Sequence, residues 1–144
     1  MPTQKEHLKI YDEDFPLFVE AGFVAIKQCD EQSAIRLFSA AYMLRPDHAA
    51  PHLGLGYLYL NLQQLDRAIA CLERSLQRDP SLALTKALLG GAFVLSKREP
   101  DRANALLDEV SKESDPDARK MAEVWMKVRD KLAEKASQQA QPAR

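Results

Sequence analysis

Apolar residues recur every three or four positions along most of the chain, a spacing typical of helices that bury one face. The pattern predicts helices over 15–28, 31–44, 49–62 and 65–78, then an apolar helix from Leu82 onward and a last helix after Pro116. Polar turns separate these segments, and several contain proline. Because a proline disfavours helical geometry in the residue before it, the prolines mark helix ends. We therefore expect an all-α protein.

A fixed period relates successive pairs of these helices. Gly22, Gly56 and Gly90 are 34 residues apart, and the same step joins Ala34 to Ala68 and Pro46 to Pro80. Such a period is typical of helix-turn-helix solenoids, in which each pair buries its apolar face by stacking on the next. Glycine or alanine at the repeated positions predicts close approach of the paired helices.

The third repeat departs from this period. Ala103 follows Ala68 after 35 residues, and Pro116 follows Pro80 after 36. We interpret the delay as one extra residue in each of two turns, 97–100 and 113–115. Because loops tolerate insertions, the helices are expected to keep their length.

These patterns divide the chain. We expect an N-terminal extension over 1–14, three repeats over 15–48, 49–82 and 83–116, a capping helix over 117–136 and a disordered tail over 137–144. The last helix is apolar on one side and charged on the other, which suits a helix that covers the exposed end of a solenoid. Trp125, the only tryptophan, is expected to anchor it.

Composition and charge exclude several classes of function. The chain has 144 residues, with 20 Lys and Arg against 21 Asp and Glu and a formal net charge of −1. No strongly basic field is available for a phosphate backbone, so a nucleic-acid partner is not expected. No apolar segment is long enough for a membrane span and no secretory signal is recognisable, so we expect a cytoplasmic protein.

Reactive side chains form no catalytic or metal-binding pattern. Cys29 and Cys71 lack a neighbouring base and are expected to be buried or half-buried thiols. His48 and His52 are four residues apart, but no third ligand has suitable spacing. We therefore expect no enzymatic activity, no metal and no cofactor.

Residues 15–116 resemble the tetratricopeptide repeat (TPR) family. Its pattern has an aromatic residue, Leu-Gly and Tyr on the first helix, then Ala, Phe, Ala and Pro. The second repeat has His52, Leu55-Gly56, Tyr59, Ala68, Leu72, Ser75 and Pro80, and the first has Phe18, Ala21-Gly22, Ala25, Ala34, Phe38, Ala41 and Pro46. The third has Lys86 at the aromatic position. The resemblance implies an all-α, right-handed solenoid of three TPR repeats with a C-terminal capping helix.

The resemblance also implies a concave groove in which the first helices of the repeats hold a peptide. The implied groove residues are Val19, Phe23, Ile26, Lys27, Ala50, Leu53, Gly54, Tyr57, Leu60, Asn61, Leu84, Ala87, Leu88, Gly91, Val94 and Leu95. One group of TPR proteins uses charged residues here to hold acidic C-terminal tails of chaperones. The matching positions are Val19, Phe23, Gly54, Leu84 and Leu88, and none donates a side-chain hydrogen bond. We therefore expect an extended apolar client, with Lys27 and Asn61 at the rim.

The apolar groove and the size of the chain are similar to bacterial type III secretion chaperones that hold translocator proteins before export. This likeness implies a cytoplasmic chaperone of a translocator-type substrate and allows a homodimer. The alternative is a structural adaptor of a larger complex. In that case residues 1–14 or a second copy of the chain would cover the groove.

Overall fold

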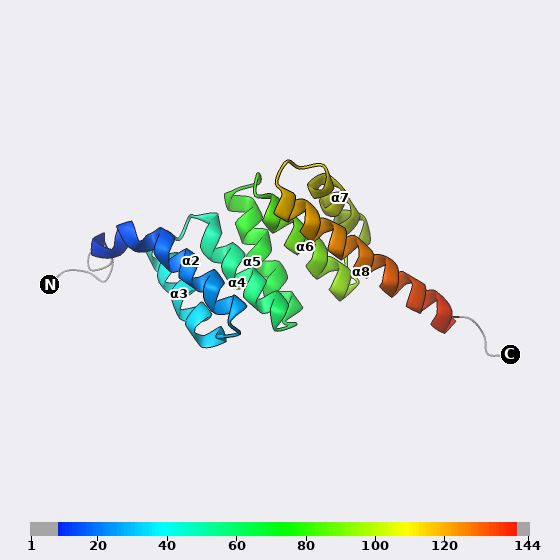
Figure 1. The fold of residues 1–144 in the computed structure, drawn as a ribbon, viewed down its shortest axis with the longest axis horizontal. Coiled ribbons are helices and arrows are strands. Elements are labelled where there is room, and N and C mark those ends of the chain that lie inside the picture. The colour runs from blue at the N-terminus through cyan, green and yellow to red at the C-terminus, as the bar shows by residue number, and fades with distance from the viewer. Residues whose placement is uncertain (1–8, 141–144) are drawn as a thin grey trace. The chain divides into compact units, whose positions relative to one another are not determined.

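The computed structural model describes residues 9–140, which are helical throughout apart from short turns (Figure 1). A 3₁₀ helix, η1 (Lys9–Asp14), precedes the α-helices. These are α2 (Phe15–Lys27), α3 (Glu31–Leu44), α4 (Ala49–Asn61), α5 (Leu65–Arg78), α6 (Ala83–Ser96), α7 (Pro100–Ser111) and α8 (Pro116–Ala140). The all-α class predicted from the pattern is confirmed. Residues 1–8 of the expected extension and 141–144 of the expected tail lie outside the described residues.

The chain divides into two compact units, residues 1–81 and 82–144. In the first unit α2 packs against α3, α4 packs against α5, and α4 also contacts α2 and α3. In the second unit α6 packs against α7, and α8 contacts both of them. Each unit therefore has its own helix pairs and its own buried side chains.

Repeated glycines allow the paired helices to approach closely. A Cβ atom built on Gly22 would lie 2.7 Å from Cζ of Phe38, and one on Gly56 would lie 2.7 Å from Cγ of Leu72. Gly90 stands in the same relation to Leu107, at 2.8 Å from Cδ2. Real Cβ atoms do not approach other atoms this closely, so the prediction of close helix packing is confirmed.

The turn inside each helix pair has the same backbone geometry. Its central residue is Cys29, Gln63 or Lys97, 34 residues apart, and each has a φ of 58°. The next amide donates to a carbonyl five residues earlier: Asp30 to Ala25, Gln64 to Tyr59 and Arg98 to Phe93. This pattern satisfies carbonyls at the helix end, although glycine usually occupies the left-handed position. Because this position is at the surface, Cys29 is exposed and the expected burial is wrong, whereas Cys71 is half-buried as expected.

The third repeat contains the first predicted insertion but not the second. In the third repeat, Arg98 lies between the left-handed residue Lys97 and Glu99, the residue directly before α7. In the second repeat, Gln64, the residue directly before α5, follows the left-handed residue Gln63 with no residue between them. The prediction of a second insertion is wrong. Helix α7 has 12 residues against 14 in α3 and α5, and Pro116 is the first residue of α8. Proline is well accommodated in the first turn of a helix, so Pro116 starts a helix where Pro80 lies in a turn.

The capping helix α8 is longer than predicted. It has 25 residues and ends at Ala140, so residues 137–140 of the expected disordered tail are helical. No glycine or proline interrupts the sequence between Pro116 and Pro142, and its alanines and glutamines favour helix. Trp125 packs over Gly91 of α6 so closely that any Cβ there would clash with the indole ring. The expected anchoring role of Trp125 agrees with this contact.

Candidate protein-binding site

Three of the predicted groove residues form one apolar surface in the first unit. Val19 and Phe23 of α2 and Tyr57 of α4 are half-buried and pack against the same buried cluster, which includes Phe38. The ring centroids of Phe23 and Tyr57 are 6.5 Å apart, and Phe23 meets Phe38 edge-on at 5.1 Å. We call Val19, Phe23 and Tyr57 the α2–α4 face.

Two polar residues occupy matching positions at the ends of the same helices. Lys27 is the last residue of α2 and Asn61 is the last residue of α4, and both are exposed. The ammonium group of Lys27 and the amide of Asn61 can both donate hydrogen bonds to carbonyl groups. The structure thus leaves both side chains accessible at the positions where rim contacts were predicted.

Several other predicted groove residues lie beneath the surface. Ile26, Leu53 and Leu60 of the first unit are at most 7% exposed, and Gly54 lies against the ring of Phe38. Ile26 belongs to the buried cluster under the α2–α4 face. Gly54 is therefore a packing residue, and its expected place in the lining of the groove is wrong.

Helix α6 carries the predicted groove residues of the second unit. Leu84 and Leu95 are half-buried, whereas Leu88 is only 1% exposed. Gly91 is covered by Trp125 of α8, so its expected place in the groove is also wrong. The capping helix of the chain itself covers this part of α6.

His52 is a packing residue, as expected. It is buried, its ring meets Tyr42 edge-on at 5.3 Å, and its Nε2 lies 3.3 Å from the carbonyl oxygen of Pro46. Burial is the main cause that lowers the pKa of His52 below its ordinary value. Among residues 9–140, no cluster of three or more His, Cys, Asp or Glu side chains could hold a metal ion.

No helix in the described part of the chain combines the length and apolar character that a membrane span requires.

The α2–α4 face is an apolar surface with exposed polar neighbours. Apolar surfaces of this kind suit contact with another protein chain. The α2–α4 face can pack against apolar side chains of such a chain, and Lys27 and Asn61 can donate hydrogen bonds to it.

Comparison with known proteins supports the repeat assignment. Residues 25–90 match the family model described as tetratricopeptide repeat. The Arabidopsis OM64 TPR domain superposes with a TM-score of 0.69 at 18% identity, over 84% of this chain and 98% of that chain. A chain of the CopN-Scc3 complex superposes with a TM-score of 0.66 at 17% identity, over 90% of this chain and 76% of that chain. A search of curated protein sequences gave no significant match.

The two structural likenesses show the fold alone because both identities are below 20%. They agree with the predicted class, an all-α solenoid of TPR repeats. The family match covers the end of α2, all of α3, α4 and α5, and the start of α6. Residues 25–90 therefore match tetratricopeptide repeats, and repeats of this kind generally mediate interactions between proteins.

Proposed function

We propose that the α2–α4 face binds an extended apolar segment of a client protein. The observation that supports this proposal is the accessible aromatic pair of Phe23 and Tyr57, which lies over a firmly packed core. Aromatic side chains on a rigid support are favourable anchors because they bury a large area and lose little conformational freedom. Lys27 and Asn61 bind main-chain carbonyls of the client and fix its register.

Within this proposal, the chain is a cytoplasmic chaperone of a translocator-type substrate of a type III secretion system. The support is the family resemblance together with the absence of charge from the α2–α4 face. A membrane-active protein exposes apolar segments until it is exported, and an apolar face can cover them. The structural likeness to a chain of the CopN-Scc3 complex shows that this fold occurs in a complex.

A structural adaptor is the second candidate, and a different surface favours it. Leu17 and Val24 of α2 and Ile35 of α3 are 60%, 45% and 39% exposed. Such residues suit contact with a second copy of the chain or with a subunit of a larger complex. Size-exclusion chromatography with light scattering distinguishes a stable homodimer from a monomer that requires a client.

Replacement of Tyr57 by glutamate tests the proposed client site. The charge would disfavour an apolar segment at the centre of the α2–α4 face, because desolvation of a carboxylate is costly. Met43→Glu is the matched control, since Met43 is 46% exposed on α3 and lies outside this face. Each protein is used to capture clients from native extract, and the retained proteins are identified by mass spectrometry.

We expect the wild type and Met43→Glu to retain the same apolar client and Tyr57→Glu to lose it. Circular dichroism confirms that all three proteins keep their helical content. Equal retention by the three proteins would contradict the assignment of the site. A client that is neither secreted nor membrane-active would contradict the secretion role alone.

A further inference from the structure

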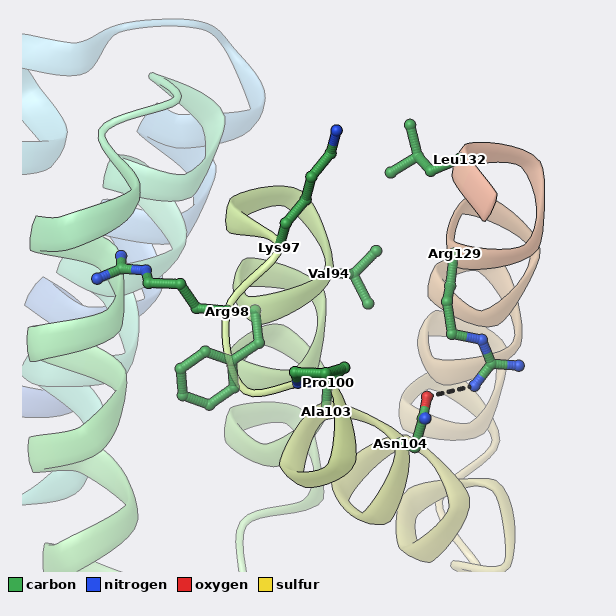
Figure 2. Close-up of a pocket in the computed structure, with 9 residues that line it drawn as sticks. Val94, Lys97, Arg98, Pro100, Ala103, Asn104, Arg129 and Leu132 are labelled. Carbon is green, nitrogen blue, oxygen red and sulfur yellow. Dashed lines mark hydrogen bonds between the residues drawn. The ribbon is translucent and has the colours of Figure 1, made fainter. Parts of the chain in front are cut away.

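The second unit contains a cavity whose lining includes only one of the predicted groove residues, Val94. It has a volume of about 300 Å³ and lies between the end of α6, the start of α7 and the middle of α8 (Figure 2). Figure 2 shows Val94 of α6 facing Leu132 and Arg129 of α8 across this space. We call it the α6–α8 cavity.

Apolar side chains form the floor of the α6–α8 cavity. Phe93, Val94 and Ala103 line it and are each no more than 9% exposed, and Leu132 adds a half-buried side chain from α8. The guanidinium group of Arg102 lies over the Phe93 ring, 5.3 Å from the ring centroid. A rigid apolar floor in a space of this size suits the insertion of one large apolar side chain.

Positive charges surround this apolar floor. Lys97, Arg98 and Arg129 line the cavity, and no Asp or Glu is among the lining residues. Arg129 is held in place because its Nη1 donates to Asn104 Oδ1 at 2.8 Å and its Nε donates to Asp130 Oδ1 at 3.1 Å. Asp130 offsets part of the charge of Arg129, and Lys97 adds a second cation to a lining without carboxylates, which favours a ligand with negative charge.

The same combination of charge and apolar surface continues along α8. Val124, Val128 and Leu132 border a second, shallower hollow of about 270 Å³, together with Lys127, Lys131 and Lys135. Leu132 belongs to both spaces. Lys131 approaches Glu134 at 4.0 Å, and residues 133–140 are exposed throughout. This continuity provides a track long enough for several residues of a bound segment.

We propose that the α6–α8 cavity binds an acidic segment of a partner protein, which inserts one large apolar side chain between carboxylates. The inserted side chain contacts the floor, and the carboxylates pair with Lys97 and Arg129. Because these cations are at the surface, apolar insertion supplies most of the affinity and the ion pairs orient the segment. This site is separate from the α2–α4 face and goes beyond the proposed function.

A peptide titration monitored by NMR tests the proposal on the full chain. The probe is an acetylated and amidated peptide of nine residues, with a central phenylalanine flanked on each side by two glutamates and two serines. We expect saturable shifts of backbone amides at Val94, Lys97, Ala103 and Leu132. Replacing the glutamates of the peptide by glutamines, or its phenylalanine by alanine, should weaken binding about tenfold each.

Variants of the chain give a second, independent readout. Arg129→Glu and Lys97→Glu reverse a charge at the cavity and should each weaken peptide binding about tenfold or more. Lys120→Glu makes the same charge change at an exposed position of α8 outside the cavity and should leave binding unchanged. The dispersion of each amide spectrum confirms that the variant is folded. Tyr57→Glu should also bind the peptide normally, so failure here and failure of the client site are distinguishable.

Three results would overturn the proposal. The first is the absence of saturable shifts in the second unit at millimolar peptide. The second is equal affinity for the glutamate and glutamine peptides, which would remove the role of charge. The third is co-sedimentation with phosphatidylglycerol-containing vesicles without any peptide-dependent shift, which would assign the basic surface to membranes.

Discussion

Two positions that the repeat family fills with aromatic residues carry polar residues in this chain. The ring of His52 meets the ring of Tyr42 edge-on, and Lys86 is only 8% exposed. The ammonium group of Lys86 lies 2.7 Å from Oε1 of Glu109 on α7 and 3.9 Å from Oε1 of Glu113 in the turn after that helix. Each polar residue therefore has specific partners at a position that is usually apolar: Tyr42 for His52, and Glu109 and Glu113 for Lys86.

The buried stem of Lys86 is expected to contribute more to stability than its charge. Lys86→Ala should lower the free energy of unfolding by about 2 kcal/mol, because the packed methylenes are lost. Lys86→Met keeps that volume and should cost less than about 1 kcal/mol. The carboxylates of Glu109 and Glu113 are partly exposed and remain hydrated in both variants. Urea denaturation measures the two values, and an equal loss in both variants would show that the ion pair dominates.

His52 is expected to make stability depend on pH. Burial lowers its pKa, the Pro46 carbonyl raises it, and Arg74 and Arg78 lower it. The folded-state pKa is thus below the unfolded value of about 6.5, and the unfolded chain binds the proton first as the pH falls. The stabilisation is fully present above that pH and is lost as the pH falls through the folded-state pKa.

His52→Phe removes this titration and provides the measurement. Between pH 7.5 and 5.5, the wild type should lose stability relative to His52→Phe in urea denaturation. His48 is present in both proteins, so its contribution cancels in the comparison. A constant difference across this range would contradict the burial of a neutral imidazole.

At the scale of elements, the spacing of apolar residues and prolines predicted the helices of the first two repeats to within one residue. It failed at α7 because Pro116 was equated with Pro80, although a proline is compatible with either a turn or a first helical turn. It could not separate buried from accessible groove positions, since Leu53 and Leu84 are the same residue type and differ only in their neighbours.

The α6–α8 cavity could not be predicted from the pattern either. Lys97 and Arg129 line it together although they are far apart in the sequence, and the repeat period does not relate them. The packing of α8 against α6 and α7 brings them to one cavity. The contact between Gly91 and Trp125 is part of that packing.

Gly91→Val is expected to displace the capping helix. The added side chain must occupy the space of the Trp125 ring, and overpacking of this kind typically costs about 1–3 kcal/mol. Because Trp125 is the only tryptophan, its fluorescence reports the change directly. We expect an emission maximum at longer wavelength and a lower midpoint of urea denaturation. Unchanged emission would show that Trp125 does not depend on Gly91.

At the scale of the whole molecule, the two units carry different candidate surfaces. The first has an apolar aromatic face with Lys27 and Asn61 nearby, and the second has an apolar cavity surrounded by cations. The central claim is that the first of these surfaces receives a client. The second remains a separate proposal with its own test.

Site-specific photo-crosslinking tests the central claim most directly. The photoreactive residue p-benzoylphenylalanine is placed at position 57 and, as a control, at position 43, and the client identified by capture is added before irradiation. We predict a covalent adduct from position 57 that maps to an apolar segment of the client, and none from position 43. Adducts from position 43 alone, or equal adducts from both positions, would contradict binding at the α2–α4 face.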